Sequence, residues 1–378
     1  MVCILFPIIA QGQKTVRARD LGIPFDGTPG PLNAITDVKG VAVGHATIIR
    51  GDGALTVGEG PVRTGVTAIF PLGKNATDGV TAGWFALNGD GEMTGTVFLS
   101  ELGELYGQIL TTNTISVGTV ASAAIEWNRL HFENNPYVLY SRVLPVVAET
   151  WDGFLNDIYG QHVTRKDVFY ALDHANGGPV KEGNVGGGTG MRNYEFKGGI
   201  GTASRVVKTE QGAYTLGVLV QSNYGRRNQL KIAGVPVGKE ITDLMPKRGK
   251  KQKVVGNSII VIIATDAPLL PKQLNRIARR TTLGLGRNGS VGMNGSGDIF
   301  IAFSTGNRLS FGSSDIRSLQ SISDMTPLFE ATVQATEEAI INGLIAGETM
   351  VGINGNTVYG LPHDRVKKIL KKYNRLEQ

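Results

Sequence analysis

Hydrophobic positions along the chain fall into continuous runs and one-sided stripes. The apolar runs at residues 256–264 and 298–303 are typical of strands buried on both faces. The stripes at 118–132, 270–282 and 326–344 repeat with helical spacing and predict helices that bury one face. Buried strands mixed with one-sided helices indicate an α/β fold class, in which helices cover layers of sheet.

Weaker patterns predict further elements. Strands are expected at residues 37–45, 142–148 and 213–220, because each contains a short apolar run. Thr164 is expected to cap a helix that continues through Leu172. No repeat or low-complexity linker divides the chain, so we expect a single domain from residue 19 to residue 378.

Glycine is the most unusual feature of the composition. The chain has 378 residues, of which 41% are hydrophobic and 52 are glycine. Many of the glycines lie at 176–201, but the third glycine of GxGxxG is out of register and the GK[ST] ending of a phosphate loop is missing. We therefore expect packing and turn glycines, around the mouth of a substrate site, rather than a nucleotide cradle.

Charge and cysteine content exclude several classes of partner. The net charge of +6 is modest, and basic clusters are not interleaved with aromatic residues, so no nucleic-acid partner is expected. Lys272, Arg276, Arg279 and Arg280 could form a phosphate-facing stripe on a predicted helix, but a solvated helix face is the favoured interpretation. The single cysteine, Cys3, and the scattered histidines show no metal-ligand spacing, so no metal is expected.

The N-terminal segment, residues 1–18, allows two interpretations. Its apolar run at 3–10 is too short to cross a bilayer, and no other segment could span one. Small residues at 10–12 suit a secretory cleavage site, although the basic region that usually precedes one is missing. A signal-peptide remnant would favour the periplasm, and a plain N-terminal extension would fit the cytoplasm. Both interpretations stay open.

Ser258 lies at the start of the longest apolar run, after a basic, proline-containing segment at 245–253. If the chain cut itself before Ser258, the new N-terminal serine would carry a nucleophile and, in its own α-amine, a base. The plainer interpretation is a polar entry into a strand. Ser296 and Asp298 precede another buried run, and the two serines could reach one point if the strands were neighbours. A turn of small residues would also explain that pair.

Several motifs occur in an order that resembles one peptidase family. Asn257-Ser258 is followed by Thr265-Asp266-Ala267-Pro268-Leu269. Further matching motifs lie at residues 30–38, 43–45, 63–67, 146–150, 187–191, 197–204 and 295–298. Together they cover most of the chain, from near residue 19 to about residue 360. The set is similar to the L-aminopeptidase D-amidase/D-esterase family, which includes the β-peptidyl aminopeptidases.

This resemblance implies a fold and a maturation step. The fold would be a four-layered αββα sandwich, similar to the N-terminal-nucleophile hydrolases but differently connected. The precursor would cut itself between Asn257 and Ser258 into an α chain, 19–257, and a β chain, 258–378. Family members assemble as homotetramers of such αβ units and need no metal or organic cofactor.

The resemblance also implies an activity and a set of site residues. The protein would be a self-processing serine aminopeptidase that releases N-terminal residues, including β-amino or D-residues, from short peptides, amides and esters. Ser258 would be the nucleophile and Asn223 an oxyanion donor, and Glu149 would bind the substrate amine. The residues expected beside these are Ser296, Asp298, Tyr140 and Trp151.

An alternative from another enzyme class is a self-cleaving acyltransferase of the ornithine acetyltransferase type. Those enzymes usually cut before a threonine, so Ser258 counts against it.

Overall fold

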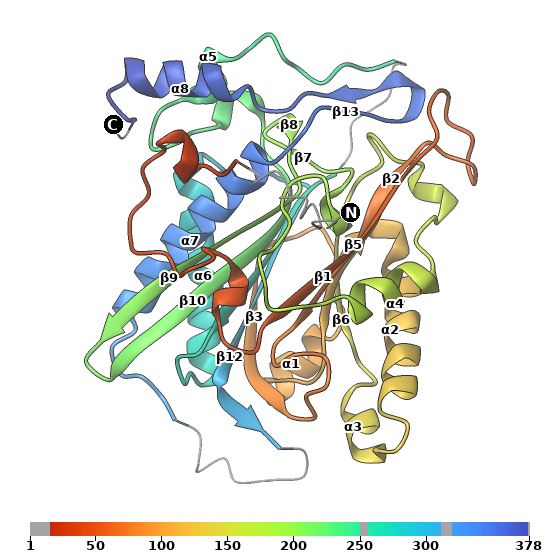
Figure 1. The fold of residues 1–378 in the computed structure, drawn as a ribbon, viewed down its shortest axis with the longest axis vertical. Coiled ribbons are helices and arrows are strands. Elements are labelled where there is room, and N and C mark those ends of the chain that lie inside the picture. Colours follow the sequence, from red (N-terminus) through yellow and green to blue (C-terminus); the bar gives the residue numbers. More distant parts are fainter. Residues whose placement is uncertain (1–15, 250–255, 311–319, 377–378) are drawn as a thin grey trace, which may run out of the picture.

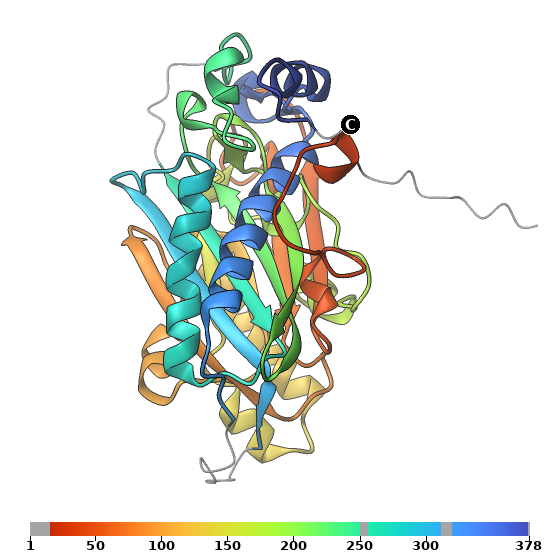
Figure 2. The same cartoon turned by 90° about the vertical axis from the view of Figure 1, so that its left-hand side faces the viewer.

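Two sheets pack face to face between two layers of helices. The computed structural model describes residues 16–249, 256–310 and 320–376. Figures 1 and 2 show the four layers, helix–sheet–sheet–helix, within a single body. The expected αββα arrangement is therefore confirmed, and the predicted α/β class with it.

The larger sheet contains the strand that begins at Ser258. Its six strands follow the order β4-β3-β12-β11-β10-β9, and β11 and β12 run parallel while the other pairs are antiparallel. The strands are β3 (Gly79–Gly89), β4 (Glu104–Leu105), β9 (Ile200–Thr209), β10 (Gly212–Asn223), β11 (Asn257–Thr265) and β12 (Ser296–Leu309).

The smaller sheet has four strands in the order β1-β2-β5-β6. They are β1 (Ala42–Arg50), β2 (Val62–Phe70), β5 (Ile109–Asn113) and β6 (Val146–Thr150). Two short hairpins complete the strands: β7 (Arg192–Asn193) with β8 (Phe196–Lys197), and β13 (Met350–Val351) with β14 (Thr357–Val358).

Each sheet is covered on its outer face by two helices. Figure 2 shows α6 (Pro271–Arg287) and α7 (Thr326–Ile345) lying across the six-stranded sheet. On the four-stranded sheet lie α2 (Val117–His131) and α4 (Arg165–Asp173). The other helices are α1 (Thr96–Leu102), α3 (Pro136–Ser141), α5 (Val237–Glu240) and α8 (His363–Lys372).

Strand β11 explains why its sequence is apolar at every position. Ile259, Val261 and Ile263 pack in the core under α6 and α7, whereas Ile260 and Ile262 pack in the core between the sheets. Because successive side chains point to opposite faces of a strand, both faces need apolar residues. The predicted strand, 256–264, differs from the observed one by a single residue at each end.

Two of the shorter predicted strands begin later than expected. The strand predicted at 37–45 is β1 and starts at Ala42, because Asp37 closes a turn by accepting from the backbone N–H groups of Leu32 and Ala34. The strand predicted at 142–148 is β6 and starts at Val146, directly after Pro145. An apolar run alone does not fix where pairing starts.

The predicted helix starts are close to the observed ones. Thr164 precedes α4 as expected. The backbone N–H and the hydroxyl of Thr164 donate to the carboxylate of Asp167, at 2.8 and 2.6 Å. Thr326, expected as the cap of α7, is instead its first helical residue.

The last residues of the N-terminal segment expected at 1–18 pack against the rest of the fold. Arg17 pairs with buried Glu182 at 2.7 Å, and Ala18 is fully buried. Residues 1–15, which contain the apolar run at 3–10, lie outside the described part of the chain. None of the helices that the structure describes is long and apolar enough to span a bilayer.

Candidate active site

Sheet register brings together residues that are far apart in the sequence. Ser258 lies opposite Asn223 of β10 on one side and opposite Gly297 of β12 on the other. Gly297 separates Ser296 from Asp298, so these two residues flank the position next to Ser258. The strands of Ser258 and Asp298 are therefore neighbours, which is what a shared site requires.

The Ser258 hydroxyl lies beside the peptide bond expected to be cut. Its Oγ donates a hydrogen bond to the carbonyl oxygen of Asn257 at 2.6 Å, and the residue is only 3% exposed. The hydroxyl thus already contacts the carbonyl group that it would have to attack. Little solvent reaches the site in the continuous chain.

The side-chain amide of Asn223 has a defined orientation. Its Oδ1 accepts from the backbone N–H of Arg192 at 2.9 Å. Its Nδ2 donates to the carbonyl of Trp151 at 2.8 Å and lies 3.5 Å from the carbonyl of Gly256. Because the oxygen end is held by Arg192, the N–H₂ end must face the Gly256–Ser258 junction. An oxyanion donor needs this direction.

Ser296 and Asp298 form a hydrogen-bonded pair at the start of β12. The Ser296 hydroxyl donates to Oδ1 of Asp298 at 2.7 Å. Asp298 is fully buried, and its Oδ2 has no hydrogen-bond partner among the residues described. Burial raises the pKa of Asp298 to about 6, since the charged carboxylate is poorly solvated. The Asp298 carboxyl group can therefore gain or lose a proton near neutral pH.

Glu149 lies near the end of β6 and is almost completely buried. Its Oε1 accepts from the backbone N–H of Glu92 at 3.0 Å, and its Oε2 accepts from the hydroxyl of Thr114. Burial is the main reason why the pKa of Glu149 is raised, and the carboxylates of Glu92 and Asp90 add to it. Within the described ranges no lysine, arginine or histidine pairs with Glu149, so a cationic group would stabilise its charge.

Gly91 shows how closely Glu149 approaches the catalytic strands. A Cβ placed on Gly91 would lie 3.1 Å from Oε1 of Glu149 and 3.2 Å from Cα of Gly297. Gly297 is the residue that pairs with Ser258. The segment between β3 and α1 therefore lies between the carboxylate and β12, the strand beside the one that carries Ser258, and a side chain on Gly91 would crowd both.

Trp151 and Tyr140 behave differently. Trp151 packs against the junction, since a Cβ on Gly256 would lie 2.6 Å from the Cβ of Trp151, and its carbonyl holds Asn223. Tyr140 lies on α3 and is 74% exposed. Because α3 precedes the start of β6 and Glu149 lies near its end, the structure does not bring Tyr140 to Glu149 within one chain.

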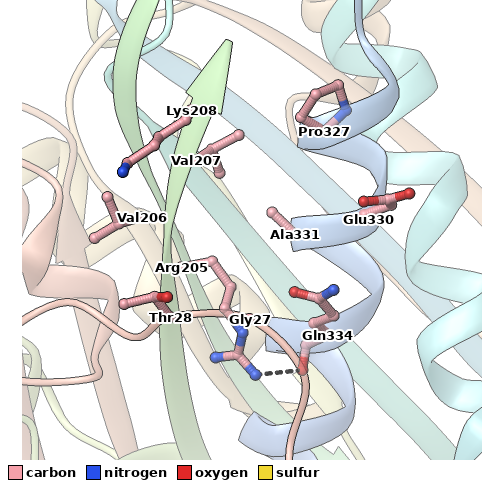
Figure 3. Close-up of a pocket in the computed structure, with 10 residues that line it drawn as sticks. All are labelled: Gly27, Thr28, Arg205, Val206, Val207, Lys208, Pro327, Glu330, Ala331 and Gln334. Atoms are coloured by element: carbon pink, nitrogen blue, oxygen red, sulfur yellow. Dashed lines mark hydrogen bonds between the residues drawn. The ribbon is translucent and has the colours of Figure 1, made fainter.

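A pocket of about 440 Å³ lies elsewhere, between β9 and α7 (Figure 3). Its wall includes Arg205, which donates to the carbonyls of Asp26, Ser204 and Gln334 and to the carboxylate of Glu338. The guanidinium is thus engaged in holding the fold together. Strand β10 separates β9 from β11, so this pocket is not part of the site around Ser258.

Neither the glycine-rich region nor the basic helix face resembles a cofactor site. Gly187 and Gly188 lie against Gln221 and Ile200 with no room for a Cβ, as expected for packing glycines. Arg276 and Arg280 stack over the ring of Phe329. Among the residues placed in the structure, no group of three or more His, Cys, Asp or Glu side chains could hold a metal ion.

Sequence reasoning missed four contributors to the site: two backbone N–H groups, one threonine and one glycine-containing segment. The backbone N–H groups of Arg192 and Glu92 leave no mark in a sequence, because every residue except proline has one. Thr114 is one of many threonines. For the segment around Gly91, the run Asn88-Gly89-Asp90-Gly91-Glu92 was a usable signal, because glycines alternating with carboxylates indicate a tight, charged loop.

Comparison with known proteins agrees with this geometry. The sequence profile of peptidase family S58 matches residues 33–358. The chain is similar to the β-peptidyl aminopeptidase BapA of Sphingosinicella xenopeptidilytica, with 53% identity over 370 residues that cover 94% of this chain and 91% of the relative.

Two solved structures share the fold over nearly the whole chain. One is the L-aminopeptidase D-Ala-esterase/amidase of Ochrobactrum anthropi, described as a prototype for the serine aminopeptidases and a new variant of the Ntn-hydrolase fold. It has a TM-score of 0.88 and 45% identity, covering 95% of this chain and 99% of that one. The other is a β-aminopeptidase from Burkholderia sp., with a TM-score of 0.84 and 44% identity, covering 94% and 99%.

Proposed function

The chain belongs to peptidase family S58, and from this premise we propose that Ser258 is its nucleophile and Asn257–Ser258 its cleavage site. The protein is a serine aminopeptidase, a hydrolase that uses an N-terminal serine. The alternative of an acyltransferase finds no support, since the relatives named above are aminopeptidases. The observation that carries the proposal is the register that sets Ser258 between Asn223 and Gly297.

Self-cleavage follows from the contact between the Ser258 hydroxyl and the Asn257 carbonyl. Oγ adds to the carbonyl carbon of Asn257, and the C–N bond to Ser258 then breaks, which leaves an ester on Oγ and a free α-amine on Ser258. Water hydrolyses the ester and leaves a carboxylate on Asn257. Asn223 Nδ2 lies 3.5 Å from the carbonyl oxygen of Gly256, one residue before the cut, and from this position would donate to the Asn257 oxygen that becomes negative.

Cleavage also gives the nucleophile its base and opens the site. An α-amine has a reference pKa of roughly 7.7–8.0, so part of it is neutral near pH 7 and can accept the Oγ proton. In the continuous chain, Ser258, Asn223, Ser296 and Asp298 are each at most 3% exposed. Substrate would reach Oγ once the cut lets the end of the α chain, where Gly256 packs on Trp151, move away.

Turnover then uses the same groups on a substrate carbonyl. Oγ of Ser258 attacks, the proton passes through the α-amine to the leaving amine, and water releases the acyl group. Ser296, hydrogen-bonded to Asp298, supports the protonated α-amine and holds it in place. This is the N-terminal-nucleophile form of triad catalysis.

The proposed substrates carry a free N-terminal amine. Glu149 supplies a buried carboxylate whose charge a substrate ammonium would stabilise, which favours aminopeptidase over endopeptidase activity. The similarity to BapA and to the Burkholderia enzyme supports β-amino acids at the N-terminus of short peptides and amides. Amides and esters of D-residues are a further proposed class, by likeness to the Ochrobactrum enzyme.

We also propose that the αβ units assemble as homotetramers. An apolar surface is formed by α1, α3 and the segment that follows α3. Its exposed members are Val97, Leu102, Tyr137, Tyr140, Val143 and Leu144. Patches of this kind mark interaction sites. Tyr140, remote from Glu149 within one chain, belongs to this surface.

Ser258→Ala tests the assignment directly. We expect a folded, uncut chain without amidase activity, whereas the wild type gives two fragments, the shorter beginning with Ser258. Electrophoresis and intact mass report the cut, and hydrolysis of an aminoacyl p-nitroanilide reports activity. Ser323→Ala, at an exposed position, is the matched control and should behave like the wild type. Retained turnover in Ser258→Ala would exclude Ser258 as nucleophile.

A further inference from the structure

Lys197 is a buried cation that the mechanism above does not use. It is fully buried, and its Nζ donates to the carbonyls of Gly198 at 2.6 Å and Gly188 at 3.4 Å. No carboxylate of the described chain forms an ion pair with it. Burial without an anion lowers the pKa of Lys197 to about 7. Burying an amine away from water and from any carboxylate costs free energy, so we expect a structural role that offsets this cost.

Its position in a hairpin provides one. Lys197 lies directly opposite Arg192 in the β7–β8 pair. The two turn residues between the strands, Tyr194 and Glu195, have φ angles of +50° and +61°. Two-residue turns of this shape normally use glycine or asparagine, because other side chains are strained there. The hairpin is therefore held by its surroundings rather than by its own turn.

This hairpin sets the position of Asn223. The backbone N–H of Arg192 donates to Oδ1 of Asn223 at 2.9 Å. The next residue, Asn193, donates from Nδ2 to the hydroxyl of Ser222 at 3.1 Å. Consecutive residues of β7 thus hold consecutive residues at the end of β10. A shift of the hairpin would release the amide oxygen of Asn223 and let the amide rotate.

Lys197 links the hairpin to the glycine-rich segments on either side of it. The carbonyl of Gly188 belongs to the segment that enters β7, and that of Gly198 follows β8. The N–H of Gly198 also donates to the carbonyl of Met191 at 3.4 Å. One Nζ therefore holds both ends of the hairpin.

We propose that Lys197 is a positioning residue for the reaction: it holds the β7–β8 hairpin so that the Arg192 N–H directs the Asn223 amide toward the oxyanion. The inference rests on the proposed function, because it assigns Lys197 an effect only through Asn223. It predicts that Lys197 influences the stabilisation of the transition state and leaves binding of the substrate amine unchanged.

A double-mutant cycle tests this. The variants are Lys197→Met, Asn223→Ala and the double variant, with kcat and KM measured on an aminoacyl p-nitroanilide and normalised to the amount of cleaved chain. We expect Lys197→Met to lower kcat by about tenfold or more, part of what losing one oxyanion donor costs, with KM within about twofold. In the Asn223→Ala background the same substitution should change kcat by less than about twofold. Lys208→Met, at an exposed lysine of β9, is the control and should leave kcat unchanged.

Each outcome decides between the two assignments. An equal loss of kcat in both backgrounds, or a change in KM alone, would overturn the positioning role while leaving the proposed function intact. If Asn223→Ala kept full activity, the oxyanion assignment would fall and the inference with it. Should Lys197→Met not fold, Lys197→Gln keeps a hydrogen-bond donor and should give a smaller loss that is again absent without Asn223. An additive loss in that variant would refute the role equally well.

Discussion

At the residue scale, the buried carboxyl of Asp298 makes the stability of the fold depend on pH. Its pKa of about 6 in the folded chain lies above the ordinary value of 3.8. The folded state therefore holds the proton more tightly than the unfolded state. This stabilising contribution is fully present below pH 3.8 and is lost as pH rises through 6. A displacement of this size corresponds to about 3 kcal/mol.

Asp298→Asn removes this contribution and can be compared in the uncut Ser258→Ala chain. We expect the free energy of unfolding of the double variant to rise relative to that of Ser258→Ala between pH 4 and pH 7, by on the order of 2–3 kcal/mol. Urea unfolding at several pH values measures it. Glu101→Gln, an exposed carboxylate, is the control and should give a curve parallel to that of Ser258→Ala. A parallel curve for Asp298→Asn would contradict the raised pKa.

Residue identities were partly predictable from the sequence. The local pattern at Ser258 could not separate the proposed nucleophile from a polar strand entry, because what distinguishes them is the place of Ser258 in the sheet, opposite Asn223 and beside the strand that begins at Ser296. Those partners are distant in the sequence and meet Ser258 only through sheet register. The resemblance to a family supplied them, and the structure brings them together. Tyr140, supplied in the same way, lies on another surface.

At the element scale, the segment between β3 and α1 helps to hold the carboxylate of Glu149, the proposed amine-binding group, in place. A Cβ on Gly91 would lie 3.1 Å from Oε1 of Glu149 and 3.2 Å from Cα of Gly297, so one of these neighbours would have to shift by a few tenths of an ångström, whereas a Cβ on Gly89 would meet no atom within 4 Å. The two glycines therefore form a matched pair two residues apart. Neither has a positive φ, so a difference between their variants reports space rather than backbone strain.

Gly91→Ala should displace Glu149 from its present position. We expect KM for a substrate with a free amine to rise about tenfold, because one misplaced charge-assisted hydrogen bond is worth roughly 1.5 kcal/mol or more. Gly89→Ala should leave KM unchanged. The measurement is KM for a free and an N-acetylated aminoacyl amide, and an equal effect on both would show that Glu149 does not bind the amine.

Element types were easier to predict than their limits. The run at 256–264 and the stripe at 270–282 contain enough periodic apolar residues to define β11 and α6. The starts of β1 and β6 were misplaced because Asp37 and Pro145 end the preceding turns through local hydrogen bonding and geometry. Turn chemistry of this kind competes with hydrophobic pattern and is visible only when the turn is known.

At the scale of the whole molecule, the proposed cut does not divide the protein into separate bodies. The β chain would contribute β11 and β12, which lie in the middle of the six-stranded sheet between β10 and β3 of the α chain. The sequence could predict sheets covered by helices, but not this strand order. The parallel pairing of β11 and β12 depends on the crossover through α6, which pattern alone does not reveal.

The apolar surface on α1 and α3 is the proposed interface between αβ units. Figure 1 shows both helices near one end of the molecule, and Gly95 at the start of α1 lies against the carbonyl of Leu144, 3.4 Å from a Cβ built there. The side chains of Val97 and Leu144 are 84% and 57% exposed. Exposed apolar side chains that lie together mark a surface that binds another protein. If the surface is an interface, a buried unpaired carboxylate would break it.

We therefore expect Val97→Asp combined with Leu144→Asp to convert a tetramer into single αβ units, as light scattering after size exclusion would show. Self-cleavage should persist in this variant, because neither residue contacts the junction. Val57→Asp, at an exposed position outside the apolar surface of α1 and α3, should keep the tetramer and serves as the control. A wild-type protein with the mass of one αβ unit, or a tetramer unaffected by the two aspartates, would remove this surface from the assembly.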